Sequence, residues 1–193
     1  MMMQKGKKHA GRIAAAVLFV FTLFGGSITL LGYPFSVFAA AKTWDGGGGA
    51  DTNWNTCTNW NNDTCPVSGA DSVTFDVTAI TNVTINTDIN VTSFTIAATY
   101  LGIISQGTSN IVATSFSQAA GTFTGGAGSF DLNGAYTLSG GTFTAPSGAM
   151  TVSGAWTHTA GGTFTHNNGS VTSDGSGNVT WDVLAPTNGR PHR

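Results

Sequence analysis

Large apolar residues recur at a nearly fixed spacing in the second half of the chain. The segments 116–135, 136–155 and the one that begins at residue 156 align with a period of 20, lengthened by one residue at Gly161-Gly162. The alignment gives four columns, which are Phe116, Tyr136 and Trp156; Phe123, Phe143 and Phe164; Phe130, Met150 and Val171; and Leu132 and Val152 followed by Ser173. Such a repeat is typical of a solenoid, in which equivalent residues stack from turn to turn.

Within each repeat, short segments alternate apolar and polar residues and are separated by glycine, as in Tyr136-Thr-Leu-Ser. This alternation indicates half-buried strands. Earlier, less regular turns are predicted from upstream apolar residues, which are Val83, Ile85, Ile89, Val91, Phe94, Ile96, Ile103, Ile104, Ile111 and Val112. We therefore predict an all-β fold, a right-handed parallel β-helix (β-solenoid) with about 20 residues per turn. A β-sandwich is the alternative, but it does not need a constant period.

The segment 44–76 differs from the repeats because it is rich in tryptophan and glycine. Trp44, Trp54 and Trp60 lie within it, and Val73 and Phe75 alternate with polar neighbours. A terminal repeat has an open core face that must be covered. We predict an N-terminal Trp-rich cap over residues 42–79, followed by β-solenoid repeats over 80–182. The three tryptophans are also a candidate sugar platform, and exposed coplanar indoles would distinguish that function from a buried cap.

The first 41 residues have the pattern of a signal peptide. A basic segment over 1–12 precedes an uncharged stretch from Ile13 to Ala41 that ends in Ala39-Ala40-Ala41. This order predicts an exported protein cleaved after Ala41. The alternative is a retained anchor, because about 20 apolar residues can span a bilayer. Glycines and a proline interrupt the stretch and favour cleavage.

Export makes a disulfide between Cys57 and Cys65 permissible. They are the only cysteines of the chain, and two cysteines without a nearby histidine do not make a zinc site. We predict that they pair and close a short loop in the cap.

Charge excludes several classes of partner. Between Thr43 and Gly189 the chain has nine Asp and no Lys, Arg or Glu. Phosphate backbones are bound chiefly through Lys and Arg, so nucleic acid is excluded, and membrane contact is expected only through the leader. Solenoid polysaccharide lyases use a Lys or Arg base, which these residues cannot supply. Asp131 aligns with Thr151 and Thr172, so the repeats form no carboxylate pair for a glycosidase.

We therefore expect no enzyme, no catalytic residues, no cofactor and no metal site. Asp45, Asp51, Asp63 and Asp71 have oxygen ligands for calcium, but their spacing matches no known loop, and Asp is a common turn former. His158 aligns with Leu138 and is expected to be a wall position. A polysaccharide-active enzyme is the less favoured alternative.

Threonines flank the phenylalanine of each repeat and are expected to form two outward rows, which are Thr122, Thr142 and Thr163 on one side and Thr124, Thr144 and Thr165 on the other. Flat Thr-x-Thr arrays on solenoids resemble ice-binding faces. The plainer explanation is that threonine is a favourable exposed strand residue.

Several motifs together resemble a known class of secreted proteins. The opening Trp44-Asp-Gly-Gly-Gly, the Asp71-Ser-Val-Thr-Phe segment and the Gly-Gly-Thr-Phe-Thr segments at 140–144 and 161–165 are similar to bacterial autotransporter passenger-like and autotransporter-associated β-strand repeat proteins. The resemblance covers most of 44–174. It implies an extracellular or cell-surface, adhesin-like protein whose partner is an unknown surface receptor or glycan.

The end of the chain departs from that pattern. Residues 183–193 have neither barrel strands nor an apolar anchor, and we expect a disordered tail or a truncated end, with the protein released or held by a partner. An uncapped last turn near 171–179 would expose strand edges, so end-to-end self-association is a further expectation.

Overall fold

The computed structural model describes residues 39–67 and 69–176 together with the backbone of 181–182, all within the unit Ser36–Arg193. The predicted leader lies outside the described residues except for its last three, and the predicted tail lies outside them entirely. Among the described residues, no helix is long and apolar enough to cross a membrane.

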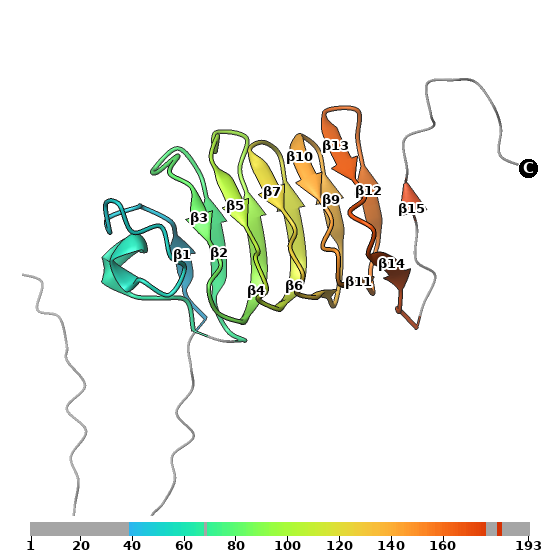
Figure 1. Ribbon diagram of the computed structural model, residues 1–193, viewed down its shortest axis with the longest axis horizontal. Helices are drawn as coiled ribbons and strands as arrows, with labels where there is room; N and C mark the ends of the chain where they lie inside the picture. The colour runs from blue at the N-terminus through green and yellow to red at the C-terminus, as the bar shows by residue number, and fades with distance from the viewer. Residues whose placement is uncertain (1–38, 68, 177–180, 183–193) are drawn as a thin grey trace, which may run out of the picture. The chain divides into compact units, whose positions relative to one another are not determined.

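The fold is a parallel β-solenoid of about five turns with roughly 21 residues in each turn. Figure 1 shows the strands of successive turns lying side by side. The predicted fold class is confirmed, with almost no helix in the described residues. On the first face, the spacing between stacked residues varies from 19 between Ile111 and Phe130 to 22 between Ile89 and Ile111.

Each of the later turns contains three short strands, one on each of three faces of the solenoid. The first face contains β8 (Phe130–Leu132), β11 (Ala149–Val152) and β14 (Ser170–Ser173). The second contains β1 (Ala41–Thr43), β2 (Ser72–Phe75), β9 (Tyr136–Leu138), β12 (Trp156–His158) and β15 (Trp181–Asp182). The third is a separate sheet of β3 (Val83–Thr84), β5 (Ile103–Ser105), β7 (Thr122–Thr124), β10 (Gly141–Thr144) and β13 (Gly162–Thr165).

Two longer strands join the first two faces. β4 (Ile89–Ile96) and β6 (Ile111–Gln118) each run along the first face and continue into the second. β6 pairs with β8 through its first half and with β9 through its second half. The first and second faces therefore belong to one ten-stranded sheet.

The register confirms all four predicted columns. Phe116 pairs with Tyr136 and Tyr136 with Trp156 on the second face, and Phe123, Phe143 and Phe164 stack on the third. The first face stacks Phe130, Met150 and Val171, and also Leu132, Val152 and Ser173. A parallel in-register stack places identical side chains about 4.8 Å apart.

Stacked aromatic rings fill the interior. The rings of Phe123 and Phe143 are stacked in nearly parallel planes, with centroids 4.9 Å apart, and those of Phe116 and Tyr136 are stacked with centroids 5.4 Å apart. Offset aromatic pairs of this kind add to the free energy of burial. The upstream turns contribute Val83, Ile89 and Ile104 to the same core, whereas Ile103 points outward and is 42% exposed.

Glycine permits the tight corners. Gly141, at the start of β10, has φ +73°, a conformation that L-residues rarely adopt. A Cβ at this position would also collide with the carbonyl oxygen of Gly121 in the turn below. The recurrent glycines of the sequence therefore mark places where the backbones of neighbouring turns approach closely.

The solenoid stack begins upstream of the predicted boundary at residue 79. β2 pairs in register with β4, and β1 pairs with β2. Ala41, the last residue of the predicted leader, is therefore the first residue of a strand.

At the other end, β13 and β14 each have a strand neighbour on one side only among the described residues. Phe164 and Val171, which belong to these strands, are only partly buried. This is the edge for which the sequence predicts self-association, and the prediction stands untested.

Candidate functional site

The N-terminal cap is built around three tryptophans that come from irregular loops. Trp44 and Trp60 are fully buried and Trp54 is 3% exposed. Their rings meet edge to face, with centroids 5.3 Å apart for Trp44 and Trp60 and 4.6 Å apart for Trp54 and Trp60. Trp54 also stacks on Phe94 of β4, so the cap rests directly on the solenoid core.

Two of the three indole nitrogens of the cap donate hydrogen bonds within it. The Nε1 of Trp60 donates to the backbone carbonyl of Trp54 at 2.8 Å, and the Nε1 of Trp44 donates to the hydroxyl of Thr81 at 2.9 Å. The three indoles thus form the interior of the cap and are not arranged as an open row of coplanar rings. This is the geometry of a buried cap and not that of a sugar platform, the other function considered for these tryptophans.

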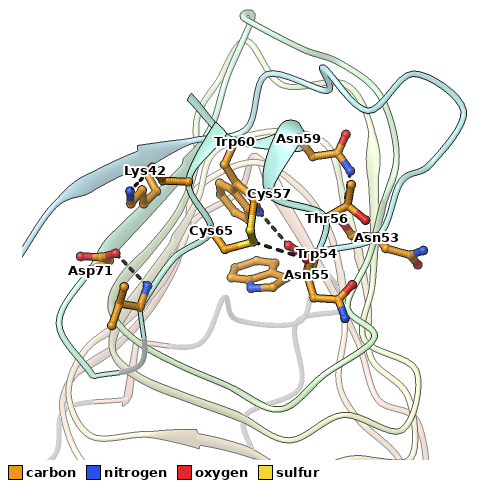
Figure 2. Close-up of a disulfide and its surroundings, with 12 residues drawn as sticks. Lys42, Asn53, Trp54, Asn55, Thr56, Cys57, Asn59, Trp60, Cys65 and Asp71 are labelled. Carbon is orange, nitrogen blue, oxygen red and sulfur yellow. Dashed lines mark hydrogen bonds between the residues drawn. A yellow bond between two sulfur atoms is a disulfide. The ribbon is translucent and has the colours of Figure 1, made fainter. Parts of the chain in front are cut away.

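A disulfide closes the cap loop beside these rings. Cys57 and Cys65 are bonded, with their Cα atoms 4.4 Å apart, as Figure 2 shows. The enclosed loop holds the short 3₁₀ helices η1 (Cys57–Asn59) and η2 (Asn61–Asp63). Trp60 lies between the two helices, so the cross-link fixes the segment that carries the central indole.

Asn59 connects the loops of the cap from a fully buried position. Its amide nitrogen donates to the carbonyls of Asp51 and Asn53, and its amide oxygen accepts from the N–H of Gly48 at 2.9 Å. A buried amide with every bond satisfied selects one loop conformation. Sequence reasoning missed this residue, because the chain contains many asparagines and nothing in the local pattern distinguishes it.

Three of the four aspartates considered for calcium, Asp45, Asp51 and Asp71, accept hydrogen bonds in the cap. Asp51 accepts from the N–H of Asn53 and from the hydroxyl of Thr56, and these bonds, the first above all, lower the pKa of its carboxyl group. Asp45 accepts from the N–H of Gly47 at 3.0 Å. Within the described ranges, no three His, Cys, Asp or Glu side chains lie close enough to hold a metal ion.

A hollow of about 230 Å³ lies beside the cap where it meets the first face. It is lined by Trp54, Asn55, Cys65, Pro66 and residues 87–91. The only ionisable lining group is Asp88, whose carboxylate accepts from the N–H of Asn110 at 2.7 Å. This hollow therefore offers amide and hydroxyl groups rather than a catalytic set.

Hydroxyl side chains form the most regular surface feature. On the second face, one outward position is Thr or Ser in six successive strands, and the second-face hydroxyl row consists of Thr43, Thr74, Thr95, Ser117, Thr137 and Thr157. The next residue in this register is Asp182 of β15. This row was not predicted from the sequence, because the spacing between its members changes from 31 residues, Thr43 to Thr74, to 20 residues, Thr137 to Thr157.

The third face carries the threonine rows predicted from the sequence. Thr122, Thr142 and Thr163 pair in one column and Thr124, Thr144 and Thr165 in the other, with the phenylalanines pointing inward. The second column extends upstream through Ser105 to Thr84. The third-face hydroxyl row is therefore Thr84, Ser105, Thr124, Thr144 and Thr165, whereas the first column continues with Ile103.

The remaining candidate groups have local partners. The Nε2 atom of His158 lies 2.9 Å from the carbonyl oxygen of Gly162, and the residue stacks on Leu138 as predicted. Asp131 accepts from the hydroxyl of Thr151 in the next turn at 2.8 Å. Neither residue is paired with a second catalytic group.

Comparisons of the chain with protein-family profiles, with curated protein sequences and with solved structures find no match.

Proposed function

We propose that the chain is an exported, non-enzymatic β-solenoid module, structural or adhesin-like, whose hydroxyl rows contact a glycan or receptor surface. The observation that carries this proposal is the second-face hydroxyl row. In-register pairing from Thr43 to Thr157 places these half-buried hydroxyls in one column along the sheet. Each hydroxyl can both donate and accept a hydrogen bond, as can the hydroxyls of a sugar polymer.

The interior of the module supports a rigid presenting role. The aromatic stack runs continuously from the cap into the turns, and most core side chains are fully buried. Groups on a rigid element lose little conformational entropy when they bind. A flat row can therefore gain affinity by repeating a weak contact along its length.

The disulfide and the charge distribution support an exposed location. Disulfides persist mainly in oxidising compartments outside the cytosol, and Cys57 and Cys65 are bonded. Lys42 is the only Lys or Arg among the described residues, and it donates to the hydroxyl of Thr64. Such a surface favours neutral, polyhydroxylated partners over anionic ones.

The test is adhesion of the exported full-length protein to immobilised polysaccharides and to cell surfaces. Thr95→Lys and Thr137→Lys place long cations in the second-face hydroxyl row and are expected to reduce retention severalfold. Asn133→Lys adds the same charge at an exposed position outside the row, and it is expected to leave retention unchanged. Equal effects of row and control variants, or no retention of the unmodified protein, would contradict the proposal.

A parallel assay addresses catalysis. Incubation of the protein with the retained polysaccharide is expected to release no new reducing ends or unsaturated sugars. If the purified protein releases such sugars and Asp131→Asn does not, a carbohydrate-processing function would replace the adhesive proposal.

A second candidate, an ice-binding face, is favoured by one observation. The third face carries paired outward threonines in three consecutive turns, at 122 and 124, 142 and 144, and 163 and 165. This is a two-dimensional hydroxyl array with about 4.8 Å between turns. Thermal hysteresis of the purified protein that is lost in Thr142→Lys would support it, and absence of hysteresis would reject it.

A further inference from the structure

Asp71 is a buried carboxylate with an unusual set of partners. The residue is 1% exposed and precedes β2. One carboxylate oxygen accepts from the N–H of Val67 and the other from the N–H of Ala40, both at 2.8 Å. A carboxylate buried among neutral groups is costly unless a cation compensates for its charge.

No side chain of the described residues supplies that cation. The ammonium group of Lys42, the only Lys or Arg in the described part of the chain, donates to the hydroxyl of Thr64 instead. Figure 2 shows Lys42 and Asp71 on the same side of the cap, with the dashed line from Lys42 leading away from Asp71. The atom nearest to the carboxylate that could become charged is the backbone nitrogen of Ala40.

We propose that an export peptidase cleaves the chain between Ala39 and Ala40, and that the new α-ammonium group of Ala40 forms an ion pair with Asp71. This inference rests on the export assumed in the proposed function. In the cleavage the Ala39–Ala40 peptide bond breaks. Water supplies the hydroxyl to the carbonyl carbon of Ala39 and a proton to the nitrogen of Ala40, which is protonated at neutral pH.

The sequence allows two cleavage points, and the structure distinguishes them. Ala39-Ala40-Ala41 suits cleavage after Ala41, and Val37-Phe38-Ala39 suits cleavage after Ala39. Cleavage after Ala41 would remove a residue of β1 and two hydrogen bonds, the one from Ala40 to Asp71 and the one from the Ser72 N–H to the Ala40 carbonyl. Cleavage after Ala39 retains both bonds and adds a charge to the first.

Ala39 itself is exposed, and Ala40 is half-buried. The chain therefore enters the fold at Ala40, and the ion pair would hold β1 against β2 at the open end of the sheet. Such a pair forms only after the leader has been removed, so it stabilises the processed protein selectively.

The first experiment expresses the full chain in an exporting host and determines the N-terminus of the exported protein by intact mass and N-terminal sequencing. The expected first residue is Ala40. An exported protein that starts at Lys42, Ala41 or Met1 overturns this inference and leaves the adhesive proposal intact. A chain that stays inside the cell with Met1 overturns both.

The second experiment isolates the charge. Asp71→Asn and the unmodified protein are each prepared in two forms. One form has a free α-amine at Ala40, and in the other that amine is selectively acetylated. Acetylation keeps the N–H donor and removes the charge. Because only the free amine adds a positive charge to the bond with the Asp71 carboxylate, Asp71→Asn is expected to raise the unfolding equilibrium constant about tenfold more in the free-amine form than in the acetylated form. Equal effects in the two forms would overturn the ion pair.

Discussion

The cap and the solenoid both bury aromatic rings, but they do so through different kinds of contact. In the solenoid, Phe123 and Phe143 are buried because the same short strand is repeated and paired in register. In the cap, Trp44 and Trp60 are buried by irregular loops that depend on a disulfide and on the side chain of Asn59. Regular pairing makes the position of each solenoid residue a consequence of its neighbours, whereas the cap needs individual contacts.

This difference predicts different responses to substitution. A solenoid turn contacts only its neighbours, so a defect in the middle of the array interrupts the stack on both sides. A defect in the cap uncovers one end and leaves the remaining turns paired.

Removal of a central ring should have the largest effect. Phe143 is fully buried between the rings of Phe123 and Phe164, and Phe143→Ala is expected to lower the free energy of unfolding by about 3–5 kcal/mol. Phe164→Ala is the matched control in the same column, where the ring is only partly buried, and its loss should be smaller. Urea unfolding followed by circular dichroism measures both. Equal losses would show that the last turn is packed as tightly as the middle.

Loss of the disulfide should have the next largest effect and should be localised to the cap. The cross-link joins residues separated by 8 positions, and closing so short a loop is worth about 2–3 kcal/mol. In Cys57→Ser/Cys65→Ser, amide hydrogen exchange is expected to accelerate around Trp60 and to stay slow in β6 and β9. Uniform acceleration would mean that the cap and the solenoid unfold as one unit.

Asn59→Ala tests the polar centre of the cap. It leaves two carbonyls and one N–H without their partner, and unsatisfied buried groups cost about 1–3 kcal/mol. The exposed Asn133→Ala in the solenoid is the control and should change stability by no more than about 0.5 kcal/mol. Thermal unfolding compares the two variants. A neutral Asn59→Ala would show that water replaces the amide.

Alkaline pH should weaken the solenoid through Tyr136. Burial raises the pKa of its hydroxyl above the ordinary value of 10.0. The unfolded chain loses this proton near pH 10.0 while the folded chain retains it, so stability is fully present below that pH and falls as pH rises above it. In Tyr136→Phe, the free energy of unfolding is expected to fall less steeply with rising pH in the alkaline range, as measured by urea unfolding. The same slope in both proteins would contradict a buried, neutral hydroxyl.

Acid should act on the cap through Asp51, with the smallest effect. The N–H of Asn53, followed by the hydroxyl of Thr56, lowers the pKa of this exposed carboxyl group below 3.8. Its stabilisation is therefore present above pH 3.8 and is lost as pH falls through the lowered folded value. Asp51→Asn should slightly reduce the loss of unfolding free energy on acidification, as measured by unfolding between about pH 2 and 5. An acid limb identical to that of the unmodified protein would show that this carboxyl group has the same pKa in both states.

The sequence predicted the repetitive part of the fold well because its period is visible. Phe123, Phe143 and Phe164 recur at nearly constant spacing, and each lies in the column expected. It predicted the upstream turns less well. Ile103 and Ile104 are equally apolar, yet only Ile104 is buried, because the pairing register and not the composition decides which one faces inward.

The functional surface was predictable only in part. The threonines at 122–165 were visible because they flank a repeated phenylalanine. The second-face hydroxyl row was not visible, since loops of different length separate Thr43, Thr74 and Thr95 in the chain. Cap residues such as Asn59 and Asp71 have no repeat to reveal them, and their importance comes from burial and from partners distant in sequence.

By itself, the sequence determined that this protein is a parallel solenoid with an aromatic interior, because a periodic pattern can be satisfied only by stacking equivalent residues. The tertiary structure decided which positions line up across unequal loops, where the stack begins, and that Ala40 lies against the carboxylate of Asp71. These features depend on pairing between segments separated by about 20 to 30 residues, and hydrogen bonds between strands carry no local signature in the chain.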